Sequence, residues 1–311
     1  MTGIPKNPSV IALGEILWDF LPSGKLLGGA PANFCHRLRQ LGATALMVSR
    51  VGKDALGKEL LEDLQALNFD LSLIQEDETQ PTGTVDVSLS EDGNPTFTIN
   101  TDVAYDRLEA TPQLLQAIQR ASLICFGTLV QRSTHTRDTV YQILDHAPNA
   151  TKFLDINLRK NCYSPETVRE SLKRADILKL NTSEVSTVSD LLELGTNTPR
   201  DLARKVIADF GVNTVLVTLG EKGVYALDAS GQECIVPGIT IQVVDTIGSG
   251  DSFAAGFVFT YLSGAPLEEC CYFGNLIGAL NATKKGGMPD ISHSELQHFL
   301  GQHYQTAERL Q

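Results

Sequence analysis

The chain of 311 residues lacks the features by which several protein classes are recognised. No apolar run approaches the ~18 residues that a membrane-spanning helix needs, and residues 1–9 lack the apolar core of a signal peptide. Acidic residues outnumber basic ones by 37 to 25 and the basic residues form no stripe, which argues against nucleic acid and anionic membranes as partners. We therefore expect a cytoplasmic protein that binds small molecules.

Metal-site and common nucleotide motifs are also missing. The six cysteines show no Cys-x-x-Cys pair and no Cys/His metal spacing, so we expect reduced, mostly buried thiols. No Gly-x4-Gly-Lys-Ser/Thr segment occurs, and no Gly-x-Gly-x-x-Gly segment follows the first predicted strand. These absences argue against a P-loop NTPase and an NAD-dependent oxidoreductase.

The most informative stretch that is present is Asp245–Phe253, where Gly248-Ser249-Gly250-Asp251 precedes an apolar run of helical length. Residues 240–244 before it read as a strand. The N–H groups at a helix start carry the positive end of the dipole, and glycine lets an anion approach, so this turn predicts a phosphate cradle. An acid would repel that phosphate, so we interpret Asp251 as a base that takes a proton from an attacking hydroxyl. The alternative is an ordinary tight turn in which Asp251 complements the helix dipole.

Strand-like and helix-like segments alternate along the rest of the chain. This order predicts an α/β fold with a mostly parallel sheet, as one domain over residues 1–311. The predicted strands are 9–13, 43–48, 122–126, 152–156, 176–180 and 214–219, and the predicted helices are 30–41, 55–67, 165–174 and 199–210, with another that starts at 112.

Residues 82–100 break this order, because apolar and polar residues alternate there around a turn at 91–94. We expect an antiparallel hairpin that pairs with strands near Trp18 and Leu26 and forms a small lid sheet from about 15–28 and 82–101. The alternative is an antiparallel edge of the main sheet.

Polar groups follow several predicted strands, at the sheet edge where parallel α/β folds bind ligands. Asp155, Asn157 and Arg159 would suit a polyhydroxy or anionic substrate. Asn181 and Glu184 are spaced either as a helix capping box or as ligands of a hydrated magnesium ion. Gly28-Gly29 with Asn33 is either a hinge and helix start or a close backbone approach to substrate.

With these residues, the chain resembles the ribokinase-like (PfkB) family of carbohydrate kinases. Gly28–Asn33, Val51–Gly57 and Asp245–Phe253 carry the resemblance, with Ile247 and Ser249 in place of the commoner Thr and Ala. The family implies a three-layer α/β/α domain with a small β-sheet lid, and transfer of the ATP γ-phosphate to a sugar hydroxyl. It also implies Mg²⁺, K⁺ as activator, and a homodimer through the lid strands.

The resemblance assigns roles position by position. Asp251 would be the general base, and the N–H groups of Gly248, Ser249 and Gly250 would form the anion hole for the transferring phosphoryl group. Sugar ligands would be Asp19, Gly28, Gly29, Asn33, Tyr105, Arg132, Asp155, Asn157 and Arg159. Nucleotide contacts would come from Asn181, Thr218, Gly220, Gly223 and Asn275, together with Gly248 and Gly250. Magnesium would bind near Asn181 and Glu184, and a monovalent cation near Asp245, Ile247, Asn281, Lys284, Gly286 and Asp290.

Within the family the sequence is most similar to bacterial fructokinases, on residues 14–19, 100–106, 127–132 and 155–159. We therefore expect D-fructose as substrate and fructose 6-phosphate as product. The Asp155-x-Asn157-x-Arg159 pattern is shared with kinases of 2-keto-3-deoxygluconate, whose carboxylate would suit Arg159, and other sugars or nucleosides are further alternatives. A catalytically silent sensor of sugar or nucleotide is the alternative from another class. The sequence leaves the sugar, the hydroxyl and the oligomeric state open.

Overall fold

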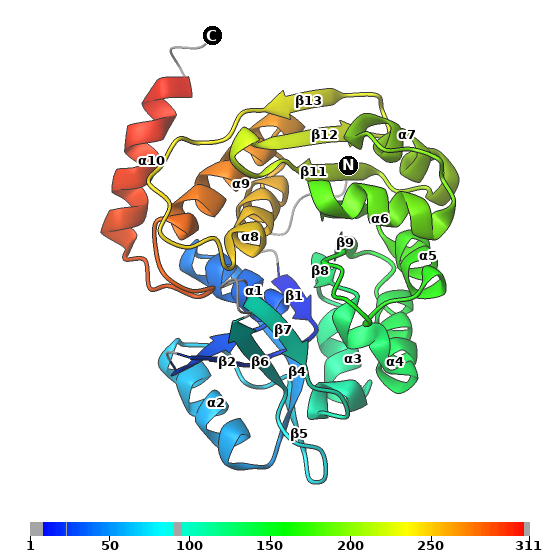
Figure 1. Ribbon diagram of the computed structural model, residues 1–311, viewed down its shortest axis with the longest axis vertical. Helices are drawn as coiled ribbons and strands as arrows, with labels where there is room; N and C mark the ends of the chain where they lie inside the picture. Colours follow the sequence, from blue (N-terminus) through cyan, green and yellow to red (C-terminus); the bar gives the residue numbers. More distant parts are fainter. Residues whose placement is uncertain (1–8, 23, 90–94, 308–311) are drawn as a thin grey trace.

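The computed structural model describes residues 9–22, 24–89 and 95–307, which form an α/β fold with two sheets (Figure 1). The nine strands of the main sheet are, in spatial order, β13 (Glu233–Val236), β12 (Val224–Asp228), β11 (Thr214–Thr218), β10 (Ile177–Asn181), β9 (Thr151–Asp155), β8 (Leu123–Phe126), β1 (Ser9–Leu13), β4 (Thr44–Gly52) and β5 (Ile74–Asp77). Neighbours from β5 to β11 pair in parallel, whereas β12 and β13 form an antiparallel edge. The mostly parallel sheet was predicted, and the antiparallel edge was not.

Helices cover both faces of this sheet, because the strands are apolar on both sides. In β1, for example, Ile11 and Leu13 join one core cluster and Val10 and Ala12 join the other. One face is covered by α3 (Pro112–Ile118), α4 (Thr134–Asp145), α5 (Pro165–Arg174), α6 (Thr182–Leu192) and α7 (Pro199–Phe210). The other is covered by α1 (Ala30–Gln40), α2 (Ala55–Ala66), α8 (Ser249–Tyr261) and α9 (Leu267–Ala282), and α10 (His293–Ala307) packs on α9. The predicted three-layer arrangement is confirmed.

Several helices begin where the sequence predicted. Thr111, Ser164 and Thr198 each accept a hydrogen bond from a backbone N–H of the first turn, and a proline follows each of them. A side-chain acceptor at this position satisfies a donor that has no partner within the helix, and proline has no N–H to leave unsatisfied. These local signals fix the start of α3, α5 and α7.

The predicted lid sheet is a separate four-stranded sheet, so the alternative of a main-sheet edge was wrong. Its strands are β3 (Gly24–Gly28), β2 (Leu17–Leu21), β6 (Thr84–Leu89) and β7 (Pro95–Ile99), in that spatial order. We call these four strands the lid sheet. The lid sheet contacts α2, because the buried Trp18 of β2 donates from Nε1 to the carbonyl of Leu56 at 3.0 Å. The predicted turn at 91–94 lies outside the described residues.

The strand predicted at 240–244 was wrong. The segment after β13 is irregular, and Val243 and Val244 are 59% and 63% exposed. The segment does not add a strand to the edge at β13, and the Val244 N–H instead donates to the carbonyl of Ala282 at the end of α9. This contact with α9, which the sequence did not reveal, takes the place of strand pairing.

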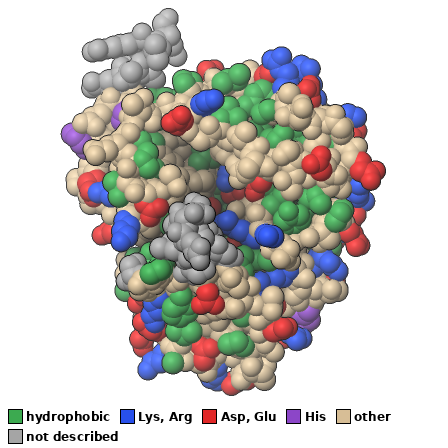
Figure 2. All heavy atoms as spheres, viewed as in Figure 1, with side chains coloured by type: hydrophobic (Ala, Val, Ile, Leu, Met, Phe, Trp, Pro, Cys, Tyr) green, Lys and Arg blue, Asp and Glu red, His purple; other side chains and the backbone are tan. Residues whose placement is uncertain are grey.

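The surface agrees with the charge analysis. In Figure 2, basic and acidic side chains are interspersed over the face in view, without a basic stripe. None of the helices in the described part of the chain combines the length and apolar composition that crossing a bilayer requires. All six cysteines are free thiols, and Cys234 alone among them is partly exposed.

Candidate active site

The first turn of α8 lines a cavity of about 1430 Å³, together with residues from the ends of several main-sheet strands. Gly248 precedes the helix with φ of 73° and no side chain caps its N–H groups. A Cβ at Gly248 would lie 2.6 Å from the Cα of Gly287, so only glycine fits there. The Ser249 N–H donates to the carbonyl of Thr246 at 3.2 Å. Since the first N–H groups of a helix lack intrahelical partners, Gly248 and Gly250 can offer donors to an anion in the cavity.

Asp251 lies in the same turn and has a defined partner. Its Oδ2 accepts a hydrogen bond from Asn33 Nδ2 at 2.7 Å, across from α1. Burial raises the pKa of Asp251 to about 6; the Asp155 carboxylate adds to this rise, and Lys179 and Asn33 oppose it. The carboxylate is therefore mostly ionised at neutral pH yet basic enough to accept a proton, as a general base must be.

Lys179 completes this end of the cavity, and the sequence reasoning missed it. It lies on β10, almost fully buried, with Nζ 2.8 and 3.0 Å from the two carboxylate oxygens of Asp155. A Cβ at Gly250 would lie 3.1 Å from this Nζ, so the amine lies against the glycine turn. Burial disfavours its charge, but Asp155 and Asp251 outweigh that effect and raise the pKa. A lysine in the apolar strand Ile177–Asn181 was the signal that could have found it.

The predicted sugar ligands converge on another part of the same cavity. Asp19 on β2 is half-buried, and burial raises its pKa to about 6 against the opposing charge of Arg159. A Cβ at Gly28 would meet the Asp19 carboxylate, and Gly29, with φ of 111°, lies equally close to the backbone of Glu15. The predicted residues that line the cavity here are Asp19, Gly28, Gly29, Asn33, Asn157 and Arg159.

Tyr105 and Arg132 are not among the residues that line this cavity, and their assignment to the sugar stays a prediction. The Arg132 guanidinium bonds to both carboxylate oxygens of Asp106 at 2.8 and 2.9 Å, to the Asn100 carbonyl and to the Tyr105 hydroxyl. Tyr105 is fully buried. The arginine is therefore engaged in fixing residues 100–106, which follow β7 of the lid sheet, and was missed in that role because its partners are distant in sequence.

The predicted nucleotide residues lie together at a third part of the cavity. Thr218, Gly220, Gly223 and Asn275 all line it. Asn275 on α9 donates to the carbonyls of Val236 and Pro237 at 3.1 and 3.0 Å, which fixes the start of the lining segment that follows β13. The structure thus brings Thr218 of β11, the turn 220–223 that follows it and Asn275 of α9 to the same cavity.

Asn181 and Glu184 form the helix capping box that the sequence left as one of two alternatives. Asn181 Oδ1 accepts from the Glu184 N–H at 3.1 Å, and Glu184 Oε2 accepts from the Asn181 N–H at 2.8 Å. Glu184 Oε1 accepts from the Leu158 N–H, so both of its oxygens are engaged. No group of three or more His, Cys, Asp and Glu among the described residues is arranged to hold a metal. The side-chain oxygens of Asn181 and Glu184 therefore suit a hydrated ion that they contact through water, and they do not suit a metal that they would ligate directly.

Two loops carry the residues predicted for a monovalent cation. The Asp245 carboxylate accepts from the N–H groups of Ile247 and Gly286 at 3.0 and 2.9 Å, which joins the loops. Asn281 donates to the Ile247 carbonyl at 2.8 Å, whereas Lys284 turns outward to Glu295. Asp290 is exposed. The binding of a monovalent cation between these loops stays a prediction.

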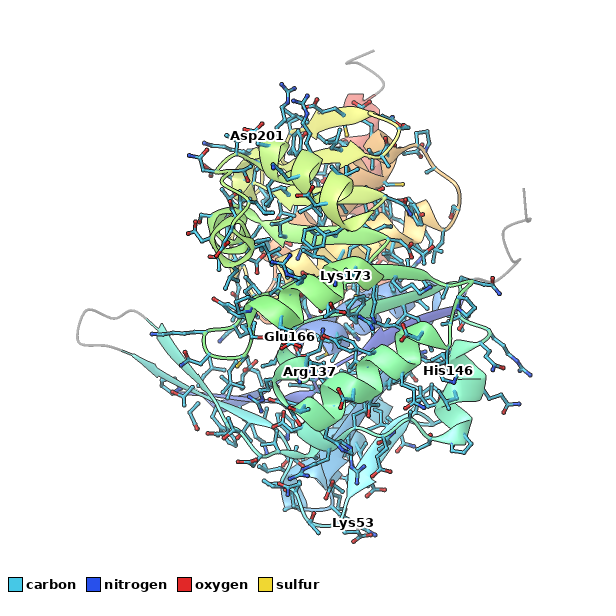
Figure 3. All side chains as sticks on the ribbon, turned by 90° about the vertical axis from the view of Figure 1, so that its right-hand side faces the viewer. Lys53, Arg137, His146, Glu166, Lys173 and Asp201 are labelled. Carbon is cyan, nitrogen blue, oxygen red and sulfur yellow. The ribbon has the colours of Figure 1, made fainter. Side chains whose placement is uncertain are left out.

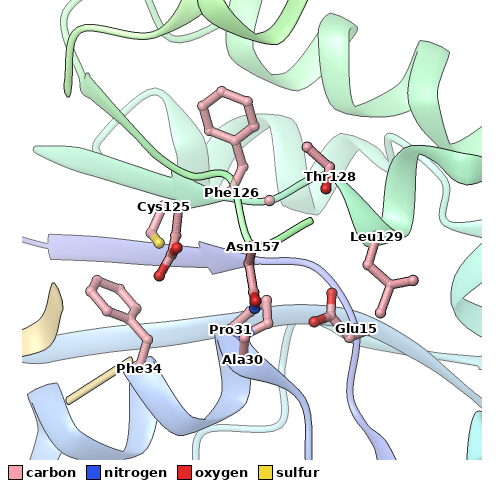
Figure 4. A pocket seen from close by; sticks show the side chains of 11 residues that line it. Glu15, Ala30, Pro31, Phe34, Cys125, Phe126, Thr128, Leu129 and Asn157 are labelled. Atoms are coloured by element: carbon pink, nitrogen blue, oxygen red, sulfur yellow. The ribbon is translucent and has the colours of Figure 1, made fainter. Parts of the chain in front are cut away.

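Glu15, just after β1, is a second residue that the prediction left out. Burial raises its pKa to about 7, against the opposing effect of its backbone hydrogen bonds and of Arg159. It lines the large cavity and, with Asn157 and Asp155, a smaller one of about 20 Å³ (Figure 4). That volume is enough for one water molecule. Asp155 therefore lies behind the sugar region, where its charge is balanced by Lys179.

Comparison with known proteins gives consistent relatives. A family model described as pfkB family carbohydrate kinase matches residues 24–294. The fructokinase of Klebsiella pneumoniae is 29% identical over 307 residues, which cover 93% of this chain and 98% of that relative.

Solved structures support the same fold. The fructokinase from Vibrio cholerae O395 in a form with fructose, ADP and calcium ion bound matches with a TM-score of 0.80 and 24% identity, over 94% of this chain and 99% of that one. An uncharacterized sugar kinase from Pyrococcus horikoshii in complex with ATP matches with a TM-score of 0.77 and 28% identity, over 93% and 97% of the two chains. The three-layer fold with a small extra sheet is thus that of its structural neighbours.

Proposed function

The chain belongs to the pfkB family of carbohydrate kinases, and from this premise we propose that it transfers the γ-phosphate of ATP to D-fructose and forms fructose 6-phosphate. Membership makes it an ATP-dependent sugar kinase. The observation that carries the proposed chemistry is the pairing of Asp251 with Asn33 beside the uncapped glycine turn of α8. The choice of fructose is supported by relatives named fructokinase, at 29% identity.

The proposed reaction uses the residues as they lie. A sugar hydroxyl next to Asp251 would give its proton to the carboxylate as it attacks the phosphorus, and Asn33 would hold that carboxylate in place. The N–H groups of the Gly248–Gly250 turn and the Lys179 ammonium would face the negative charge of the transferring phosphoryl group. Donors held in place before the reaction stabilise such charge without reorganising.

We propose that Mg²⁺ arrives with ATP and keeps most of its waters. The phosphates would hold the ion, with Asn181 and Glu184 reached through water, because both Glu184 oxygens already accept backbone hydrogen bonds. A potassium ion would bind between the loops 245–247 and 284–286. Replacing K⁺ by tetramethylammonium should then lower kcat several-fold, and equal rates in the two salts would remove this site.

The lid sheet would close over the sugar. Its side chains Leu17, Val85 and Ile99 line the cavity, so closure would exclude water and suppress ATP hydrolysis. Pairing of lid strands between two subunits would give a homodimer, and we propose a cytoplasmic location for it.

The second candidate substrate is 2-keto-3-deoxygluconate. Arg159 lines the sugar end of the cavity, and no ion pair within the described residues involves it. A cation without a fixed partner is suited to a substrate carboxylate. Fructose has no carboxylate, so the two candidates make different demands on this residue.

The deciding experiment measures ADP release from ATP and Mg²⁺ with D-fructose, ribose, glucose, 2-keto-3-deoxygluconate and adenosine. We expect the highest kcat/KM with fructose, and a change of KM below about threefold in Arg159→Met. Turnover of the keto acid, with KM raised at least tenfold in Arg159→Met and unchanged in the neighbouring control Lys160→Met, would replace fructose. No turnover by folded protein that binds ATP would favour the sensor.

A further inference from the structure

Arg37, in the last turn of α1, is a buried cation that the proposed reaction does not use. It is 3% exposed, and each of its three guanidinium nitrogens has a neutral side-chain partner. Nε donates to Ser252 Oγ at 3.3 Å, Nη2 donates to Asn281 Oδ1 at 2.8 Å, and Nη1 donates to Gln40. No ion pair among the described residues includes Arg37, so its direct contacts are hydrogen bonds to neutral groups.

Two of these partners lead directly to the glycine turn. Asn281 uses its other amide atom, Nδ2, to donate to the carbonyl of Ile247 at 2.8 Å, immediately before Gly248. Ser252 donates from Oγ to Asn281 Oδ1 at 3.0 Å, and its N–H donates to the carbonyl of Gly248 at 2.8 Å. Ser252 and Asn281 are fully buried. The hydrogen bonds from Arg37 therefore lead to Ile247, which precedes the glycine turn, and to Ser252, which follows it.

The same helix also holds the proposed base. Asn33 lies one helical turn before Arg37 on α1, and it donates to Asp251. Asn33 and Arg37 thus fix two parts of the α8 start, the carboxylate and the turn that carries it. A shift of α8 against α1 would disturb both parts together.

We propose that Arg37 is a positioning residue that, through Asn281 and Ser252, holds the Gly248–Gly250 turn in the geometry needed for phosphoryl transfer. Burial lowers the pKa of Arg37 to about 10 against the opposing effect of Asp290, so it stays charged at neutral pH. A buried charge without an ion pair is costly, and hydrogen bonds to charged donors are stronger and more directional than neutral ones. The inference rests on the proposed function for its catalytic consequence, whereas its structural content does not depend on the sugar.

Amide hydrogen exchange tests the structural part without any substrate. Arg37→Met removes the three donors and keeps a long side chain, so the amides of 248–252 should exchange at least about tenfold faster in the ligand-free protein. The matched control is Arg39→Met on the same helix, because Arg39 bonds instead to the carbonyls of Ala45 and Asn68, away from α8. Unchanged exchange of 248–252 in Arg37→Met, or equal acceleration in Arg39→Met, would overturn the proposal.

Kinetics test the catalytic part with whichever sugar the wild-type protein phosphorylates. We expect Arg37→Met to lower kcat about tenfold or more, with sugar KM changed less than threefold, because the turn and not the sugar region is displaced. Arg39→Met should keep wild-type kcat. If Arg37→Met keeps kcat within twofold of the wild type, the proposal fails. If the wild type phosphorylates no sugar, the proposed function fails, while the exchange result still decides the structural part.

A second variant covers the case in which Arg37→Met does not fold. Arg37→Lys keeps the cation but reaches fewer of the three acceptors. It should accelerate exchange of 248–252 and lower kcat at least about threefold at unchanged sugar KM. Wild-type exchange and kcat in Arg37→Lys would show that the forked donor set is not needed and would overturn the proposal.

Discussion

Helices α7 and α8 both begin with an aspartate at the third helical position, Asp201 and Asp251, and the two starts differ in everything around it. At α7, Thr198 caps the helix, and its hydroxyl also donates to the exposed Asp201 carboxylate at 2.7 Å. Asp201 lies at the periphery of the molecule (Figure 3). At α8, a glycine with positive φ replaces the cap, and Asp251 turns to Asn33 of another helix.

This comparison shows how a structural helix start differs from the start of α8, for which we propose a catalytic role. At α7 the first-turn donors are satisfied within four residues, so the aspartate completes a local cap. At α8 the donors line a cavity, and a buried lysine and a second carboxylate lie beside them. At α8, burial and the neighbouring carboxylate therefore raise the pKa of the aspartate at this helical position.

The largest expected effect comes from removing the two aspartates in parallel. Asp251→Asn should lower kcat by about 10³-fold or more, because amides do not accept the proton, while ATP affinity stays nearly intact. Asp201→Asn should leave kcat unchanged. Steady-state kinetics and ATP titration of the two proteins check this, and an Asp251→Asn enzyme with more than a tenth of wild-type kcat would rule out Asp251 as the base.

A smaller effect should follow from removing the cation beside each helix start. Lys179→Met should lower kcat by about 10²-fold, since the ammonium next to Gly250 faces the developing charge on the phosphoryl group. Arg200, in the first turn of α7, is an exposed cation that pairs with Glu233. Arg200→Met should not change kcat. Circular dichroism must show both variants folded, because Lys179 also neutralises Asp155. A folded Lys179→Met enzyme with wild-type kcat would contradict the role.

The acid limb of the activity should report Asp251. Its folded pKa is raised to about 6, and the ionised form is the base, so kcat should be constant above pH 7 and fall toward tenfold per unit below about pH 6. Because burial also raises the pKa of Asp19 to about 6, Asp19→Asn is the control and should keep this limb. If the fall of kcat at low pH disappears in Asp19→Asn, the titrating group is Asp19 of the lid sheet and not Asp251.

The smallest effect concerns the side-chain cap of α7, a feature that α8 lacks. Thr198→Ala should lower the free energy of unfolding by about 1 kcal/mol, because it leaves a first-turn donor of α7 without its side-chain acceptor. Its kcat should match the wild type. Urea unfolding and kinetics on the same preparation check both statements, and a loss of activity at full stability would mean that α7 contributes to the site.

Local signals predicted much of this molecule. The caps at Ser164 and Thr198 and the alternation over 82–100 act within a few residues, so the elements that they predicted are present. The strand predicted at 240–244 was wrong because Val244 contacts the end of α9 instead of pairing with the sheet edge at β13, and strand propensity does not reveal such a contact. The ion pair of Arg132 with Asp106 was not predicted, since a residue type and a family pattern do not reveal which partner packs beside it.

The sequence by itself determined the alternating α/β fold and the separate lid sheet, and it singled out the glycine turn with Asp251 as the candidate site. Periodicity, capping and glycine conformation express short-range forces that operate along the chain. Only the tertiary structure decided that Lys179 of β10, Asn33 and Arg37 of α1, and Asn281 of α9 surround the start of α8. These contacts join residues up to 244 positions apart, and burial sets their charges and pKa values only once the packed layers exclude water.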